Sequence, residues 1–198
     1  MALDIPTEFN LAAWFLDRPA EEHPDRIAIL GEPTVVRYGE LRELANRAGN
    51  ALRAMGCAPG DRVLIVLPDS LEFLAAFFGT TKIGAVAIPV NSMARKADYA
   101  YYLSDCGARI AIVHSSALGE FLPIMEEKPL ELVVAGGAEA KGTGAEYRNW
   151  DDWIAGASAK LDAHPTSAGD IAFLLYTSGS GGQPKAAIHQ HKNMFVTS

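Results

Sequence analysis

The sequence predicts an α/β protein with a largely parallel, doubly wound sheet flanked by helices. Five short apolar runs recur along the chain, and they are continuous rather than alternating, as in strands buried on both faces of a parallel sheet. Segments with helical periodicity separate these runs, and such alternation is typical of βαβ units. The predicted strands cover residues 63–67, 86–90, 110–113, 132–135 and 171–175.

The clearest predicted helix covers residues 39–55. Its apolar residues, beginning at Leu41, recur at i, i+3, i+4, i+7, i+11 and i+14 and form one face, and Gly56 supplies a stop signal. A second helix is predicted over about 70–82, with Ser70 or Asp69 as its cap. The remaining elements are helices over about 97–104, 117–126 and 151–159, and a hairpin over 28–38.

Two segments lack either pattern. Residues 136–146 are rich in glycine and predict a mobile loop, and residues 162–169 predict a surface linker into the last strand. Strand-like runs continue on both sides of each segment, so neither predicts a domain boundary. We expect residues 1–198 to form a single unit.

Composition excludes several classes of protein. The 198 residues include 17 Lys and Arg against 24 Asp and Glu, a net charge of −7, which argues against a nucleic-acid binder with a basic stripe. The apolar runs are far shorter than the roughly 20 residues that span a membrane. Asp4 and Glu8 stand where an export signal would be basic, and Cys57 and Cys106 lack metal-site spacing. These features predict a cytoplasmic protein with free thiols.

The segment that follows the last predicted strand carries the chemistry. Glycines let a backbone turn tightly and expose its N–H groups to an anion, hydroxyls add hydrogen-bond donors, and a lysine adds a compact positive charge that suits phosphate. The carboxyl edge of a sheet is also where α/β proteins bind ligands. The predicted phosphate-binding residues are Thr177, Ser178, Gly179, Ser180, Gly181, Gly182, Gln183, Pro184 and Lys185.

A plain surface turn and two familiar phosphate loops fit this segment less well. A Gly/Ser-rich stretch alone more often forms a surface turn, but the hydroxyls before the glycines and the Pro-Lys end argue against that. A Walker A loop needs Gly before its lysine and Ser or Thr after it, whereas Pro184 and Ala186 stand there. Position 184 also breaks the dinucleotide fingerprint. Residues 186–189 favour a strand, so the segment is expected to join two strands.

The segment from Tyr176 to Lys185 resembles the signature phosphate loop of the adenylate-forming superfamily, which includes acyl-CoA and aryl-CoA synthetases. The likeness continues through His189, His191 and Asn193. Upstream, the chain is most similar to the benzoate-CoA ligase group. The residues that carry this similarity are 9–12, 49–53, 60–63, 88–92 and 98–103. The resemblance implies that residues 1–198 are the N-terminal part of an AMP-binding domain.

The resemblance also implies a reaction. Such ligases join a carboxylic acid to AMP from ATP, release pyrophosphate and pass the acyl group to coenzyme A, with Mg²⁺ sharing the charge on the phosphates. The loop would hold the β- and γ-phosphates, Lys185 would close it, and His191 would lie near the acid-binding side of the pocket. The implied partners are an aromatic acid, ATP and CoA, without nucleic acid or membrane, and a homodimer stays open.

Departures from the family pattern weaken these expectations. Gly181 replaces the usual threonine and Ala186 the usual glycine, so we expect a weaker interaction with ATP. The family's other working parts, including the C-terminal domain, are not recognisable in these 198 residues, so we expect this chain alone to be inactive as a ligase. The alternative is a non-catalytic phosphate- or nucleotide-binding module. A kinase-type hydrolase is disfavoured by Pro184 and Ala186.

Several other polar and aromatic residues stand out without forming a predicted site. His189 and His191 lie two apart and would share one side of a strand, but no carboxylate or thiol stands near them in sequence, so no metal site is predicted. Tyr99, Tyr101 and Tyr102 are interpreted as packing and surface residues.

Overall fold

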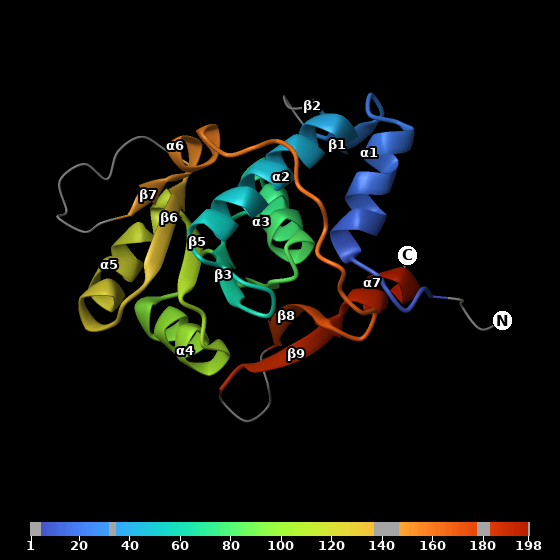
Figure 1. Cartoon of the computed structure of the whole chain (residues 1–198). Helices are drawn as coiled ribbons and strands as arrows, with labels where there is room; N and C mark the ends of the chain where they lie inside the picture. Colours follow the sequence, from blue (N-terminus) through green and yellow to red (C-terminus); the bar gives the residue numbers. More distant parts are fainter. Residues whose placement is uncertain (1–4, 32–34, 137–146, 178–182, 198) are drawn as a thin grey trace.

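The computed structural model describes residues 5–31, 35–136, 147–177 and 183–197. A seven-stranded sheet runs through the molecule in the order β7-β6-β5-β3-β4-β8-β9, and only the pair β8–β9 is antiparallel (Figure 1). Its strands are β3 (Arg62–Val66), β4 (Val86–Pro89), β5 (Ile110–His114), β6 (Glu131–Ala135), β7 (Arg148–Asn149), β8 (Ile171–Thr177) and β9 (Lys185–Gln190). All five predicted strands, and the strand expected after the phosphate segment, are confirmed.

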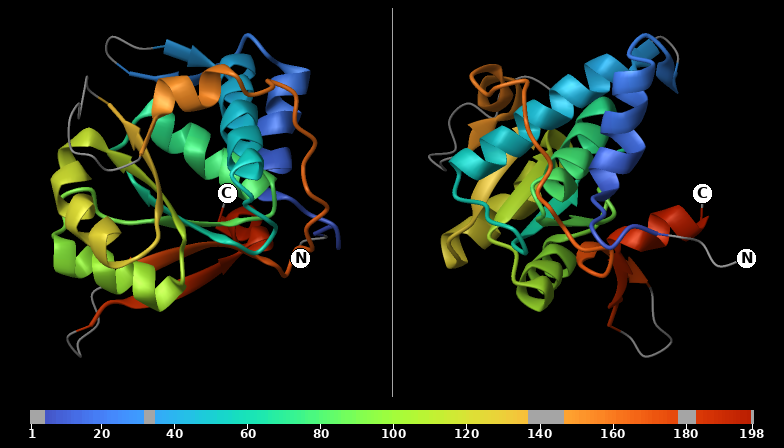
Figure 2. Two further views of the ribbon diagram at one scale, coloured as in Figure 1. Left: turned by 60° about the vertical axis from the view of Figure 1, so that its left-hand side comes forward. Right: turned by 45° about the vertical axis from the view of Figure 1, so that its right-hand side comes forward.

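Helices cover both faces of the sheet, as the continuous apolar runs predicted. On one face α2 (Tyr38–Ala54), α3 (Leu71–Lys82) and α6 (Trp150–Ala155) pack on one core cluster. On the other face α4 (Lys96–Cys106) and α5 (Leu118–Glu127) pack on a second cluster (Figure 2). Neighbouring residues of β3 alternate between the two clusters, and Leu64 and Ile65 are both fully buried. The predicted fold class, α/β with a mostly parallel sheet between helices, is therefore confirmed.

Local sequence signals explain the helix boundaries. The Ser70 hydroxyl accepts a hydrogen bond from the Phe73 N–H at 3.2 Å, which confirms the predicted cap of α3. Helix α6 begins after Asn149, whose side chain accepts from the first-turn amides, and it ends at Ala155, earlier than predicted. Helix α4 is followed by Gly107, which adopts φ 69°, a conformation that favours glycine.

The N-terminal segment adds elements that periodicity did not predict. A π-helix (Ala13–Asp17, η1) leads into α1 (Arg18–Glu22), and both pack beside α2. The predicted hairpin forms from β1 (Ile27–Leu30) and β2 (Val35–Arg37), which pair antiparallel. The short elements η2 (Ser115–Ala117) and α7 (His191–Thr197) complete the described chain.

The segment 162–169 leads into β8, as predicted, and most of its residues are exposed or half-buried, but it also makes contacts that a plain surface linker would not make. It is irregular, but Thr166 is buried and its hydroxyl donates to the Phe9 carbonyl at 2.9 Å. The Phe9 N–H in turn donates to the Thr166 carbonyl, and the Asn10 amide donates to the His164 carbonyl. We call this segment the strap, because its hydrogen bonds fasten it to Phe9 and Asn10. The predicted loop over 136–146 lies, except for Gly136, outside the described residues.

Within the described ranges, no helix is both long and apolar enough to cross a membrane.

Candidate active site

The predicted phosphate segment joins β8 to β9, two antiparallel strands at one side of the sheet (Figure 1). Because β8 runs parallel to β4, Thr177 at its end lies at the carboxyl edge of the parallel strands, where α/β proteins bind ligands. The strand-to-strand connection expected from the sequence is confirmed. Ser178, Gly179, Ser180, Gly181 and Gly182 lie outside the described residues.

The two described ends of this segment, Thr177 and Lys185, lie next to each other across the β8–β9 pair. Thr177 pairs with Lys185 in the ladder, and its hydroxyl lies 3.4 Å from the Lys185 carbonyl oxygen. Both residues are exposed, as is Gln183, and Pro184 is half-buried. The Lys185 ammonium has no carboxylate partner in the described part of the chain. An exposed lysine without a local counter-charge, next to a hydroxyl, is suited to an anionic ligand.

Tyrosines on α4 and β8 surround the same two ends. The Tyr101 hydroxyl donates to the Pro184 carbonyl at 2.8 Å, and the Tyr176 hydroxyl donates to Asp105 at 2.6 Å. Burial, with the hydrogen bond to Asp105, raises the pKa of Tyr176, so the phenol stays protonated and donates. Tyr101 and Tyr102 do pack, as predicted, but the Tyr101 contact with residue 184 needed the fold to become visible.

His191 lies away from the mouth of the segment. It begins α7, one full strand beyond Lys185, which is about 20 Å at the usual rise per residue. The ring is completely buried, and Nδ1 accepts the Leu11 N–H at 3.0 Å. Burial lowers the pKa of His191 to about 4, and the charge of Asp170 only partly opposes this. The ring is therefore neutral, with its proton on Nε2, which has no hydrogen-bond partner among the described residues.

His189 and His191 do not share one side of a strand. Strand β9 ends at Gln190, so His191 turns into the helix, while the His189 ring stacks on Phe173 at 4.4 Å between centroids. In the ranges that the structure covers, no three His, Cys, Asp or Glu side chains gather as a metal site would require.

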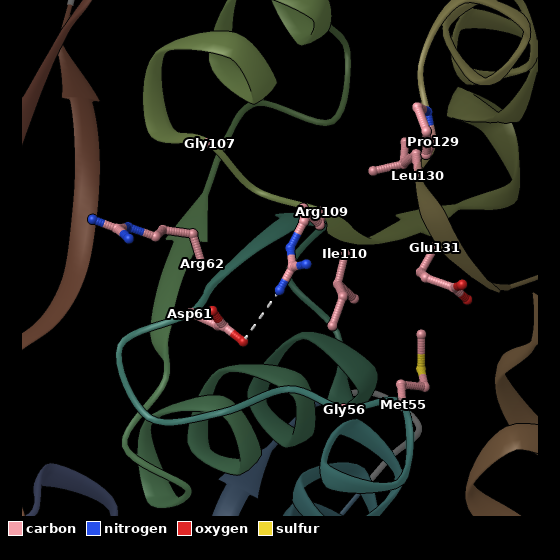
Figure 3. A pocket seen from close by; sticks show the side chains of 10 residues that line it. All are labelled: Met55, Gly56, Asp61, Arg62, Gly107, Arg109, Ile110, Pro129, Leu130 and Glu131. Atoms are coloured by element: carbon pink, nitrogen blue, oxygen red, sulfur yellow. Dashed lines mark ion pairs between the residues drawn. The ribbon is translucent and has the colours of Figure 1, made fainter.

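A separate pocket lies at the opposite, amino-terminal edge of the sheet (Figure 3). Its floor is formed by the starts of β3, β5 and β6, with Met55 and Gly56 below. Asp61 and Arg109 face each other there at 3.8 Å, and the side chain of Glu131 is paired with Arg148. The pocket lies at the edge of the sheet opposite the one at which β8 ends in Thr177, so it is not part of the candidate active site.

Comparison with known proteins agrees with the fold and shows the family to which the chain belongs. The chain matches the family described as "AMP-binding enzyme" over residues 16–198. It is 37% identical over 169 residues to 3-hydroxybenzoate–CoA ligase of Aromatoleum sp., covering 84% of this chain and 31% of that protein. It is 34% identical over 200 residues to benzoate–CoA ligase of Thauera aromatica, covering 99% and 37% respectively.

A solved structure of the anthranilate CoA ligase AuaEII in complex with anthranoyl-AMP superposes with a TM-score of 0.91 at 32% identity, covering 98% of this chain and 37% of that one. The chain thus spans about a third of the length of these relatives. Among the relatives are both aryl-CoA ligases and long-chain-fatty-acid–CoA ligases. A match over nearly the whole chain shows that it belongs to the family of AMP-binding enzymes.

Proposed function

We propose that this chain is the N-terminal part of an AMP-forming aryl-CoA ligase, in which the segment from Thr177 to Lys185 grips the phosphates of ATP. The observation that carries the proposal is the position of this segment, between β8 and β9 at the carboxyl edge, in a chain that is 32% identical to a ligase solved with anthranoyl-AMP. The aryl preference rests on the hydroxybenzoate–CoA and benzoate–CoA ligases among its relatives.

In the proposed mechanism the segment binds the phosphates of ATP and stabilises the negative charge that develops on them during the reaction. As the acid's carboxylate attacks the α-phosphorus of ATP, negative charge grows on the departing pyrophosphate. The Lys185 ammonium and the Thr177 hydroxyl, together with the N–H and hydroxyl groups of residues 178–182, would be donors for that charge. Mg²⁺, when bound with ATP, would neutralise part of it. Coenzyme A then takes the acyl group, and AMP leaves.

His191 stays a prediction as a residue near the acid. Its Nε2 proton is a donor without a described partner, which supports a contact with a carboxylate or another acceptor. The complete burial of the ring and its distance along β9 from Lys185 favour a packing role. A cytoplasmic location likewise stays a prediction, for which the free thiols of Cys57 and Cys106 are the support.

The substrate class is tested by reading the coding sequence beyond residue 198 and assaying its purified product. Benzoate, hydroxybenzoates and fatty acids of several lengths are offered with ATP and CoA, and AMP is detected by a coupled assay. We expect AMP with the aromatic acids. AMP formed only with fatty acids would replace the aryl proposal by an acyl one, and no AMP with any acid would favour the non-catalytic module that Gly181 and Ala186 suggest.

The 198-residue chain itself is expected to be inactive as a ligase, because it spans only about a third of its relatives. Benzoate-dependent exchange of labelled pyrophosphate into ATP measures the first half-reaction directly. We expect no exchange above the rate without benzoate. Exchange by the purified chain would contradict the proposed division of the active site between this chain and the rest of the enzyme.

A further inference from the structure

Helix α4 contacts both ends of the segment that is proposed to bind phosphate. At the entrance, Asp105 of α4 accepts the hydrogen bond of Tyr176 at 2.6 Å. At the exit, the Tyr101 hydroxyl of α4 donates to the Pro184 carbonyl at 2.8 Å. Tyr101 and Asp105 are four residues apart, so they lie on the same face of the helix. Both views in Figure 2 show α4 running along β8 and β9, the strands that carry these ends.

Both contacts are made by one helix, α4, so a single element holds the two ends of the segment. Tyr176 immediately precedes Thr177, and Pro184 immediately precedes Lys185. Helix α4 is itself anchored by Tyr99, which is fully buried in the core cluster that also holds Leu64 of β3 and Ile88 of β4, and whose ring lies 4.7 Å from that of Phe121 on α5. A helix held in this way transmits its position to both residues that flank the phosphate segment.

We propose that Tyr101 and Asp105 are positioning residues for phosphate binding, because they hold the two ends of the segment at a fixed separation. The inference rests on the function proposed above. Glycine loses more conformational freedom than any other residue when it is ordered, and the sequence between these ends holds Gly179, Gly181 and Gly182. Fixing the ends beforehand lowers the entropy that binding must overcome, which is the general gain from preorganisation.

The alternative role of Tyr101 and Tyr176 is packing by their rings alone. Tyr102 serves to distinguish packing from positioning. Its ring lies 4.5 Å from the Tyr176 ring, in the same aromatic cluster, but its hydroxyl has no hydrogen-bond partner among the described residues. Removing the Tyr102 hydroxyl therefore leaves the packing and both end contacts in place. If the tyrosines only pack, the hydroxyls of Tyr101, Tyr102 and Tyr176 are equally dispensable.

The test compares Tyr101→Phe and Tyr176→Phe with the control Tyr102→Phe in the 198-residue chain. The dissociation constant of MgATP, and separately of magnesium pyrophosphate, is measured by calorimetry. We expect Tyr101→Phe and Tyr176→Phe each to bind both ligands about threefold to tenfold more weakly, since each loses one of the two hydrogen bonds that hold the ends of the segment. The dissociation constants of the control should stay within about twofold of those of the unmodified chain. The urea midpoints of Tyr101→Phe and Tyr176→Phe should fall only modestly, because each loses one intramolecular hydrogen bond, and all three variants should be fully folded without urea, which separates positioning from loss of fold.

Hydrogen exchange of the chain without ligand tests the Tyr101–Pro184 contact independently. Amide hydrogen exchange of residues 183–187 should be faster in Tyr101→Phe than in Tyr102→Phe. If the unmodified chain binds MgATP and both end-contact variants bind it equally well, the inference is overturned and the proposed function stands. If the unmodified chain binds neither ligand, the phosphate assignment fails and the inference fails with it.

Discussion

At the residue scale, His191 shows how one buried contact decides a protonation state. The Leu11 N–H points at Nδ1, so only the tautomer with its proton on Nε2 can accept that hydrogen bond. A doubly protonated ring would lose the contact and place a charge in the core. Burial accordingly lowers the pKa of His191 to about 4.

This shift makes the stability of the fold depend on pH. Between about pH 6.5 and 4 the unfolded histidine binds a proton that the native one does not, so stability should fall as the pH falls through that window. The loss between pH 7 and pH 5 should be about 2 kcal/mol from this residue. Urea unfolding of the chain and of His191→Gln at both pH values measures it.

The variant should lose that part of the pH dependence even if it is less stable at pH 7. His23→Gln is the control, because it replaces an exposed histidine instead of the buried one. Equal pH dependence in the chain and in His191→Gln would contradict the burial argument.

Residue-scale prediction from sequence worked where chemistry is local and failed where it is not. The Ser70 cap and the strand that follows the Thr177–Lys185 segment depend on neighbouring residues, and the structure confirms both. The Leu11 contact of His191 joins residues 180 positions apart, and the Tyr101 contact with Pro184 joins residues 83 apart. Neither leaves a local pattern, so His191 was expected on a strand beside His189.

At the element scale, α2 and α3 approach closely enough that a methyl group would not fit between them. A Cβ on Gly79 would lie 2.7 Å from the Ala45 carbonyl oxygen and 2.8 Å from the Gly49 nitrogen, both backbone atoms that cannot rotate away. Gly79→Ala should therefore destabilise the chain by about 1–3 kcal/mol, because the helices must separate. Urea unfolding gives the value.

Gly119→Ala is the matched control for this prediction. Gly119 also lies in a helix, α5, but a Cβ there meets nothing within 4 Å. Alanine should be neutral or stabilise by up to about 1 kcal/mol, because it favours the helix. If Gly79→Ala were no more destabilising than Gly119→Ala, the close packing of α2 on α3 would be wrong.

A buried ion pair ties three helical elements together. Lys82 of α3 is 2% exposed at its side chain, and Nζ lies 2.5 Å from Asp17 of η1 and 2.6 Å from the Asn46 oxygen of α2. Burial lowers the pKa of Lys82, and Asp17 opposes that effect. The periodic pattern of the sequence did not predict this lysine as a core residue, since its partners are 36 and 65 positions away.

Lys82→Met should cost about 3–5 kcal/mol of stability, because it removes the cation from the Asp17 carboxylate, whose side chain is only 16% exposed, and from the buried Asn46 oxygen. Arg148→Met breaks the Arg148–Glu131 pair, whose side chains are about half exposed, and should cost less than about 1 kcal/mol. Chemical denaturation of both variants makes the comparison. A cost for Lys82→Met no larger than that for Arg148→Met would show that the ion pair does not fasten the helices.

At the scale of the whole molecule, the apolar runs and helical periods predicted the class of fold but not the order of its strands. Strand β8 lies beside β4, although some 80 residues separate them in the chain. The strap at 162–169 binds Phe9 through contacts that only the assembled chain brings together. Long-range pairings of this kind are set by tertiary packing, which one-dimensional patterns do not encode.

If the segment from Thr177 to Lys185 binds phosphate, calorimetry should detect binding of MgATP to the 198-residue chain. The unmodified chain should bind, Lys185→Ala should bind about tenfold to a hundredfold more weakly through loss of one charge-assisted contact, and the exposed Lys160→Ala should bind normally. Equal affinity of Lys185→Ala and the unmodified chain for MgATP would contradict the account.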